Sequence, residues 1–375
     1  MTTAVTVKGG SACRIPWARP VLWGNEATYA REAVESTHWS AGPFLERLEA
    51  EFAALLGVGT DCCLAVANGT AALHLPLLAL GLQPDDEVVI TGWGFAAAAN
   101  MTRLVGAKPV FCDVDADSWV ATAETIAPVL SSRTRAVVVI HNYGIVSPMT
   151  EIVQLLRDRN IVLVEDCAES LFSRIDGDMS GSFADIAIWS FQATKTISCG
   201  EGGMVVSKSA ALTEKMRLVR SHGMRTNPKY VHWELGHNFR LTNVQAAIAV
   251  AQLEKREEII RTRRHVYDRY RASLNHLPVR LQHVPPDVEP VMWGLGMIAD
   301  ERVGKSRGEV MARLDEAGIE TRPGFVAFSA QPIYRADPLP VSDRLSDNVF
   351  SLPFPPDLKD EDIDYIASSL AAVLA

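Results

Sequence analysis

The sequence predicts an α/β fold in which helices cover both faces of a mostly parallel sheet. Between about residues 60 and 210, short apolar runs that look like buried strands alternate with stretches of helical periodicity. This alternation is typical of parallel sheets, whose crossover helices cover both faces. The predicted strands lie at 62–66, 87–90, 109–111, 136–140, 160–164, 183–189 and 204–206.

Helices are expected between these strands and beyond them. They include 70–80 and 149–159. Pro76 interrupts the first of these, and we expect it to kink the helix or to remove one of its hydrogen bonds. A further helical pattern runs from 242 to about 274 without Gly or Pro, and it could link a large domain to a smaller one.

We therefore predict two domains, a large one over 1–255 and a smaller C-terminal α+β domain over 256–375. The C-terminal part contains weaker strand patterns and a Pro-rich stretch at 353–356. A final helix is expected to start near Asp360.

Composition and charge argue against several classes of function. The chain has 375 residues, of which 48% are hydrophobic and 22% are charged, an ordinary globular composition. Its formal net charge of -9 argues against nucleic acid or an anionic membrane as a partner. The N-terminus lacks a basic region followed by an apolar core, and no run reaches 18 apolar residues. We therefore expect a cytoplasmic protein that is neither secreted nor membrane-spanning.

The cysteines and histidines show no metal-binding pattern. None of the cysteines forms a C-x-x-C pair, and the nine histidines include no H-E-x-x-H spacing. We therefore expect reduced thiols and no metal site. The six cysteines are Cys13, Cys62, Cys63, Cys112, Cys167 and Cys199.

Lys195 is the most informative residue because of the segments on either side of it. The apolar run 183–189 precedes it, and the glycine-rich turn 200–203 follows. Upstream, another strand pattern has Glu165 and Asp166 at its C-terminal end. The two strands could thus deliver an acid and an amine to one edge of a sheet, where open α/β folds bind ligands. The alternative is a surface lysine and an acid that caps a helix.

An acid and a lysine placed in this way suit pyridoxal phosphate. Lys195 would hold the cofactor aldehyde as a Schiff base. Asp166 would keep the pyridine nitrogen protonated, so that the ring can accept electrons.

Two further segments follow strands and could contact such a cofactor. Gly69 allows close backbone approach, and Thr70 adds a hydroxyl at a helix N-terminus, which is a natural anion site. Helix capping is an equal alternative for this segment, and no Walker loop or G-x-G-x-x-G motif follows the strands. Trp93 and Phe95 follow another strand, and either could stack on a cofactor ring or pack in the core.

Taken together, these residues resemble the DegT/StrS group of pyridoxal-phosphate-dependent sugar aminotransferases, which have the aspartate aminotransferase fold (fold type I). The resemblance runs from about Ile15 to Leu374. It rests on the segments 68–73, Glu165-Asp166, Ser190-Phe191 with Lys195, 200–203 and 236–247.

The resemblance implies roles for individual residues. Lys195 forms the covalent link to the cofactor and moves the proton, and Asp166 pairs with the ring nitrogen. Asn238 reaches the phosphate from the neighbouring subunit, so a homodimer with shared active sites is expected. The other implied contacts are Gly69, Thr70 and Ser190 at the phosphate, Phe95 on the ring, Glu169 near the ring hydroxyl, and Arg240 and Arg322 as substrate candidates.

Several positions depart from the commonest pattern of this group. Glu169 stands where Gln or His is frequent, and a second acid there is expected to be protonated or turned towards substrate. Glu169, 195–197 and 221–224 resemble the perosamine-synthase-like subset, which acts at carbon 4. His237 replaces a usual Tyr or Phe, and Gly324 replaces an aromatic that often follows the proline.

The predicted function is transfer of an amino group from L-glutamate to a nucleotide-linked 4-keto-6-deoxyhexose, with TDP or GDP as the nucleotide. Three alternatives are open: a 3-keto sugar aminotransferase, a pyridoxal-phosphate-dependent sugar dehydratase and a non-catalytic sensor that binds the cofactor. Dehydratase relatives have His at the lysine position, so Lys195 favours transfer. Intact Lys195 and Asp166 argue against the sensor.

Overall fold

The computed structural model describes residues 15–225, 227–334 and 336–375, so Cys13 lies outside the described residues. The helices are α1 (Glu26–Glu35), α2 (Pro43–Leu56), α3 (Gly69–Leu80), α4 (Ala97–Leu104), α5 (Ala123–Ile126), α6 (Met149–Leu156), α7 (Ala210–Arg220), α8 (Asn243–Glu254), α9 (Arg256–Leu274), α10 (Arg307–Glu316), α11 (Pro340–Asn348) and α12 (Asp360–Leu374). The strands are β1 (Cys63–Val66), β2 (Glu87–Thr91), β3 (Lys108–Cys112), β4 (Thr134–Ile140), β5 (Val162–Asp166), β6 (Arg174–Ile175), β7 (Asp178–Met179), β8 (Ile186–Ser190), β9 (Gly203–Ser207), β10 (Val279–Leu281), β11 (Val288–Glu289), β12 (Leu295–Ala299), β13 (Arg322–Pro323) and β14 (Phe350–Leu352).

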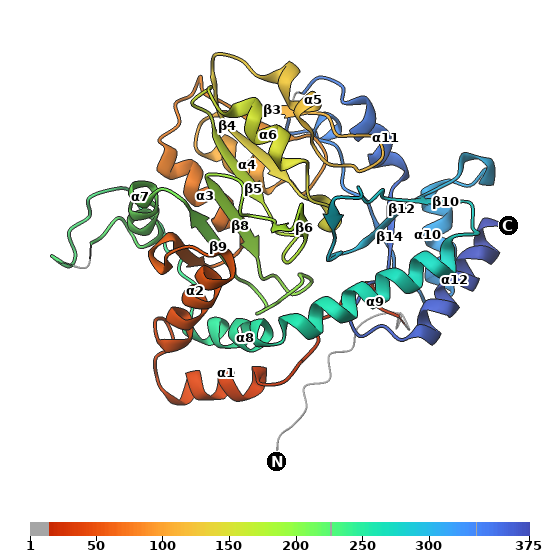
Figure 1. The fold of residues 1–375 in the computed structure, drawn as a ribbon, viewed down its shortest axis with the longest axis horizontal. Coiled ribbons are helices and arrows are strands. Elements are labelled where there is room, and N and C mark those ends of the chain that lie inside the picture. Colours follow the sequence, from red (N-terminus) through yellow and green to blue (C-terminus); the bar gives the residue numbers. More distant parts are fainter. Residues whose placement is uncertain (1–14, 226, 335) are drawn as a thin grey trace.

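A central sheet with the strand order β1-β9-β8-β5-β4-β2-β3 crosses the larger part of the molecule (Figure 1). Strands β8, β5, β4, β2 and β3 pair in parallel, whereas β9 pairs antiparallel with both β8 and β1. The prediction of a mostly parallel sheet is confirmed. The predicted strands are also confirmed, with ends that shift by a few residues.

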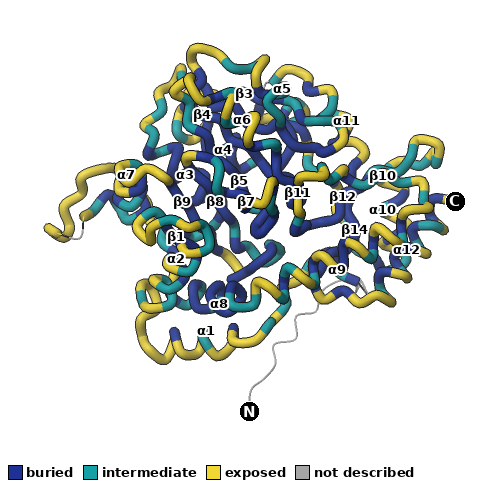
Figure 2. Tube along the Cα trace, viewed as in Figure 1, coloured by how far each residue is buried: buried dark blue, intermediate teal, exposed yellow. Residues whose placement is uncertain are grey.

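Most residues of the central strands are buried, and they are dark blue in Figure 2. In β4, Ala136, Val138 and Ile140 pack in the cluster that includes α3 and α4. Val137 and Val139 of the same strand pack in the cluster that includes α6. Alternate residues of one strand therefore enter two apolar layers, and this is why the sequence shows unbroken apolar runs.

Two helical predictions meet different outcomes. Helix α3 passes through Pro76 and ends at Leu80, although Pro76 has no N–H to donate within the helix. The pattern from 242 to 274 forms two helices that are separated at Lys255 (φ -99°, ψ 13°). Neither Gly nor Pro causes this break. Helix α8 packs on α1 and α2, whereas α9 packs on α12. The bend therefore lets the two helices pack on different parts of the molecule.

The C-terminal part contains an antiparallel sheet of order β10-β12-β14-β13, with α9, α10 and α12 around it (Figure 1). Its apolar core is not separate from the larger part. Trp93, Trp119 and Tyr143 lie in the same cluster as Leu295 and Met297 of β12. The division between 255 and 256 stays a prediction, and it coincides with the bend at Lys255.

The segment between α7 and α8 extends away from the body of the molecule (Figure 1). We call its residues 222–225 and 227–236 the arm. It exposes large apolar side chains, with Tyr230 83% exposed and Leu235 96% exposed. Among the described residues, no helix combines the length and the apolar character needed to cross a membrane.

Candidate functional site

The ends of three strands meet at one cavity of about 990 Å³. Strand β5 ends at Asp166, β8 ends at Ser190 just before Lys195, and β1 leads into the start of α3. Because Asp166 is in register with Ile188 of the parallel strand β8, the acid and the lysine segment reach the same sheet edge. The predicted residues that line the cavity are Gly69, Thr70, Phe95, Asp166, Glu169, Ser190, Lys195 and Asn238.

One end of the cavity is the N-terminus of α3. Asn68 Oδ1 accepts a hydrogen bond from Ala71 N at 2.8 Å and caps the helix. Gly69 lies against Ser190 so closely that an added Cβ would be 2.8 Å from the Ser190 Cβ. This close approach brings free helix amides and the Thr70 and Ser190 hydroxyls to one place, which suits a phosphate group.

Asp166 is a buried acid beside this cradle. Burial raises its pKa to about 6, while the hydrogen bond from Ala168 N and the charge of Lys195 lower the pKa. Glu169 raises the pKa of Asp166 through like-charge repulsion. A carboxyl in this state would gain from a cationic partner, so the site fits a protonated pyridine nitrogen.

Lys195 also lines the cavity, with its side chain 14% exposed, and we call its surroundings the amine end. Its Nζ is 3.1 Å from Glu169 Oε1. Glu169 Oε2 accepts a hydrogen bond from the backbone N of Tyr143 at 2.9 Å. Glu169 is thus turned towards the lysine amine in this structure.

The two aromatic candidates differ in location, because Phe95 lines the cavity and Trp93 lies in the core. Phe95 lines the cavity and is 65% exposed, so its ring is free to stack on a ligand. Trp93 is fully buried, packs edge-on against Trp119, and donates its indole N–H to Phe325 O at 2.8 Å. Core packing is therefore the role of Trp93.

Three predicted residues depend on a partner chain or a substrate for their role. Asn238 lines the cavity of its own chain, and its reach to the phosphate of a neighbouring subunit stays a prediction. Arg240 and Arg322 are not among the residues that line the cavity, and their contact with substrate also stays a prediction. Arg322 donates to Glu320 Oε1 at 2.7 Å, and its guanidinium lies 5.8 Å from the centre of the Trp17 ring.

Trp293 is the main site residue that sequence reasoning missed. Its ring centre is 4.0 Å from Lys195 Nζ, and its indole N–H donates to Thr194 O at 2.9 Å. His74 and Phe325 also line the cavity without having been predicted. No motif surrounds Trp293, and the only signal was an aromatic residue just before a weak strand pattern.

A buried group of possible metal ligands lies behind β5. His141, Glu165 and Cys167 have ligand atoms within 4.8 Å of one another. The Glu165 carboxylate already accepts hydrogen bonds from the backbone N–H groups of 181, 183 and 184, and from His141 Nε2 at 3.1 Å. His141 Nδ1 accepts from Ser147 N, so His141 holds the loop after β4 and Glu165 holds the loop before β8.

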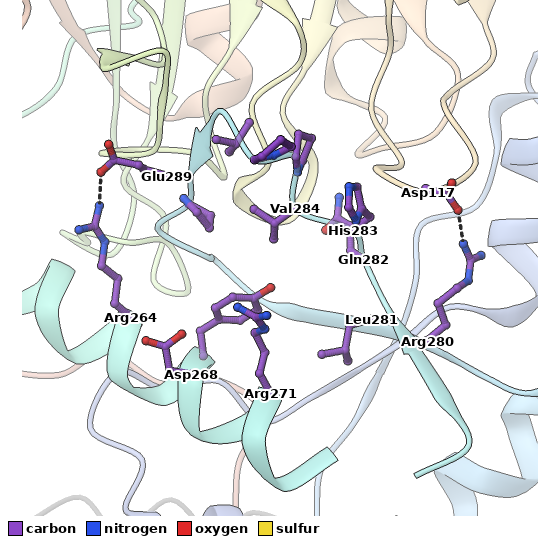
Figure 3. Close-up of a pocket in the computed structure, with 15 residues that line it drawn as sticks. Asp117, Arg264, Asp268, Arg271, Arg280, Leu281, Gln282, His283, Val284 and Glu289 are labelled. Atoms are coloured by element: carbon purple, nitrogen blue, oxygen red, sulfur yellow. Dashed lines mark hydrogen bonds and ion pairs between the residues drawn. The ribbon is translucent and has the colours of Figure 1, made fainter. Parts of the chain in front are cut away.

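A second cavity of about 760 Å³ lies between α9 and residues 281–290, away from all predicted site residues (Figure 3). Its charges largely pair with one another. Arg264 donates to Glu289 at 3.4 Å, and Arg280 donates to Asp117 at 2.9 Å (Figure 3). The candidate active site is therefore the cavity around Lys195.

Comparisons with known proteins identify the family of the chain. Residues 22–371 match the sequence model of the DegT/DnrJ/EryC1/StrS aminotransferase family. GDP-perosamine synthase of Escherichia coli O157:H7 is 35% identical over 95% of this chain and 97% of its own length. GDP-perosamine synthase of Caulobacter vibrioides is 36% identical over 96% of this chain and 98% of its own length.

Solved structures show the same fold. The aminotransferase TlmJ from Streptoalloteichus hindustanus superposes with a TM-score of 0.91 at 31% identity, covering 96% of this chain and 98% of that chain. DesI in the presence of its TDP-sugar product gives a TM-score of 0.87 at 28% identity, covering 96% and 93%. The α/β fold predicted from the sequence is confirmed.

Proposed function

Because this chain belongs to the DegT/DnrJ/EryC1/StrS aminotransferase family, we propose a particular amino transfer for it. The chain is a pyridoxal-phosphate-dependent enzyme that transfers an amino group to a nucleotide sugar. We propose L-glutamate as the donor and carbon 4 of a 4-keto-6-deoxyhexose as the acceptor. We also propose GDP as the nucleotide.

One observation supports the proposed site above all others. Asp166 at the end of β5 and Lys195 just after the neighbouring strand β8 line a single cavity, and the close approach of Gly69 and Ser190 in that cavity supports a phosphate site there. When bound there, pyridoxal phosphate supplies an electron sink for the substrate carbon that carries the amine. Lys195 would be the attachment point and the residue that moves the proton, and Asp166 would hold the proton on the ring nitrogen.

The remaining roles follow from position. Thr70 and Ser190 would hold the phosphate together with the first amides of α3. Phe95 would stack on one face of the ring. The contact between Glu169 and Lys195 Nζ at 3.1 Å supports a role for Glu169 in holding the lysine amine.

The choice of GDP over TDP rests on relatives. Three curated relatives named GDP-perosamine synthase, including that of Vibrio cholerae, are 33–36% identical over 95–96% of this chain. The choice of carbon 4 rests on Glu169, on Lys195-Thr196-Ile197 and on Ser221-His222-Gly223-Met224.

A single assay tests whether L-glutamate is a donor, which nucleotide the sugar carries and which carbon is aminated. GDP- and TDP-linked 4-keto-6-deoxyhexoses are each incubated with the enzyme and L-glutamate, and NMR locates the new amine. We expect faster conversion of the GDP sugar, with the amine at carbon 4. An amine at carbon 3, or conversion of the TDP sugar alone, would contradict the corresponding part of the proposal, and a deoxygenated product would identify a dehydratase.

We further propose that the chain works as a cytoplasmic homodimer with shared active sites. The arm supports this proposal, because its exposed Tyr230 and Leu235 lie close in sequence to Asn238 at the cavity. Sedimentation of the purified chain tests the dimer. Mixing inactive Lys195→Ala chains with Asn238→Ala chains tests sharing: recovered activity supports it, and verified mixed dimers without recovery contradict it.

A further inference from the structure

The amine of Lys195 lies between two side chains of opposite chemistry. Glu169 Oε1 is 3.1 Å from Nζ, and the ring centre of Trp293 is 4.0 Å from the same atom. A carboxylate attracts an ammonium group by charge, and an indole face attracts it through the ring quadrupole. Glu169 is buried and Trp293 is partly buried, so little water competes for the ammonium group.

Glu169 and Trp293 both bond to the backbone of one residue, Tyr143. The backbone N–H of Tyr143 donates to Glu169 Oε2, and the backbone O of Tyr143 accepts from the backbone N–H of Trp293, each at 2.9 Å. Tyr143 has the left-handed backbone angle φ of 58°, which costs energy in a residue with a side chain. Because Glu169 and Trp293 both bond to this residue, its backbone conformation fixes how far apart they lie.

Trp293 is fixed in place from several directions. Its indole N–H donates to Thr194 O at 2.9 Å, one residue before Lys195. Trp17 packs edge-on against it with ring centres 5.3 Å apart. On the backbone side, the buried guanidinium of Arg263 donates to the carbonyls of Met292 at 3.2 Å and Trp293 at 3.4 Å. Such a ring keeps its orientation whether or not the lysine lies on it.

We propose that Trp293 is a positioning residue that, together with Glu169, holds the free ammonium group of Lys195 at one place in the cavity. The inference rests on the proposed role of Lys195 and adds a defined position for its amine whenever that amine is not covalently engaged. A lysine side chain has four rotatable bonds, and ordering them costs conformational entropy. An amine that is already held in place does not lose this entropy at each proton transfer.

The direct test measures how readily Lys195 is acylated. The full-length chain is first freed of cofactor with hydroxylamine, which releases a lysine-bound aldehyde as its oxime, and is then dialysed. It is treated briefly with isotope-labelled acetic anhydride, and peptide mass spectrometry compares Lys195 with the exposed Lys359. We expect Trp293→Leu to raise the relative labelling of Lys195 about tenfold, because the ammonium form loses its aromatic contact. Glu169→Gln, which keeps the side-chain shape, should raise labelling in the same direction.

Two controls separate a direct contact from loosened packing. Trp293→Phe keeps an aromatic face, so its labelling should stay near the wild-type value. Trp17→Leu disturbs the same aromatic cluster without touching Lys195, so it should also label like the wild type. Unchanged labelling in Trp293→Leu, or an equal rise in Trp17→Leu, would overturn the proposal for Trp293, and unchanged labelling in Glu169→Gln would remove Glu169 from it.

A parallel measurement separates this inference from the proposed function. Wild-type protein is incubated with pyridoxal phosphate, reduced with borohydride, and digested. Modification of Lys195 supports its role as the attachment point. Failure of the wild type to fix the cofactor at Lys195 would reject that role, whereas the labelling comparison tests the Trp293 contact by itself.

Discussion

The two ends of the active-site cavity offer different kinds of groups to a ligand. At the phosphate end, the groups offered to a ligand are largely backbone amides at the start of α3, and Gly69 lets them approach Ser190. At the amine end, the charged and aromatic side chains of Glu169, Lys195 and Trp293 converge from distant parts of the chain. Loss of one functional group should therefore be severe at the amine end, whereas the phosphate end should be sensitive mainly to added bulk.

The largest expected effect is at the amine end. Lys195→Ala removes the proposed attachment point and proton carrier, so we expect turnover to fall by about 10⁴-fold or more. Lys195→Arg keeps the positive charge and should be equally inactive, because arginine stays protonated. Steady-state assays check the rate, and borohydride fixation of the cofactor checks the attachment. Near-normal turnover in either variant would refute the assignment.

Asp166→Asn tests the buried acid of the cavity. A neutral amide does not hold a proton on the ring nitrogen, so we expect turnover to fall by about 10²- to 10³-fold while the cofactor remains bound. Rate measurements with saturating pyridoxal phosphate check this. A rate close to that of the wild type would show that Asp166 does not contact the ring nitrogen.

Gly69→Ala tests the backbone fit at the phosphate end. The new Cβ would lie 2.8 Å from Ser190 Cβ, and overpacking of this kind costs about 1–3 kcal/mol. We expect the cofactor dissociation constant to rise by roughly tenfold to a hundredfold, with a smaller change in turnover at saturating cofactor.

Gly308→Ala is the matched control for Gly69→Ala. Gly308 lies near the start of α10, and an added Cβ there approaches only Ser306 Oγ, at 4.0 Å. Titration of the cofactor into each variant should show normal binding for the control. Equal weakening in both variants would contradict a specific contact at Gly69.

The last expected effect is on stability and depends on pH. The pKa of Asp166 is raised from 3.8 to about 6 in the folded state, chiefly by burial. The stabilisation from its protonated form is complete below pH 3.8 and is lost as pH rises through about 6. In cofactor-free protein, Asp166→Asn should therefore raise the free energy of unfolding at pH 8 by on the order of 2–3 kcal/mol.

Denaturant unfolding at pH 4 and at pH 8 checks this prediction. The Asn variant and the wild type should differ little at the lower pH, because the wild-type carboxyl is then mostly protonated in the folded state. A difference that is constant between the two pH values would contradict burial as the cause.

The contrast between the phosphate end and the amine end also explains how much of the site could be predicted from the sequence. Gly69, Thr70 and Ser190 directly follow or end strands, so local periodicity places them at the sheet edge, and Lys195 and Asp166 follow the same logic. Trp293 could not be found in this way, because its position depends on contacts with Tyr143 and Thr194 that are far away along the chain. The antiparallel direction of β9 and the bend at Lys255 likewise follow from packing rather than from local residue patterns.

The shared apolar cluster has a consequence for protein engineering. Exchange of residues 256–375 between relatives is an obvious way to transplant acceptor preference, since the boundary lies at a bend between helices. However, Trp119 and Tyr143 of the recipient would have to fit the donor's β12, because they lie close against Gly296 of that strand here. Trp93 packs on both of these rings. A chimera should therefore carry these three aromatic residues along with the C-terminal part as a single graft.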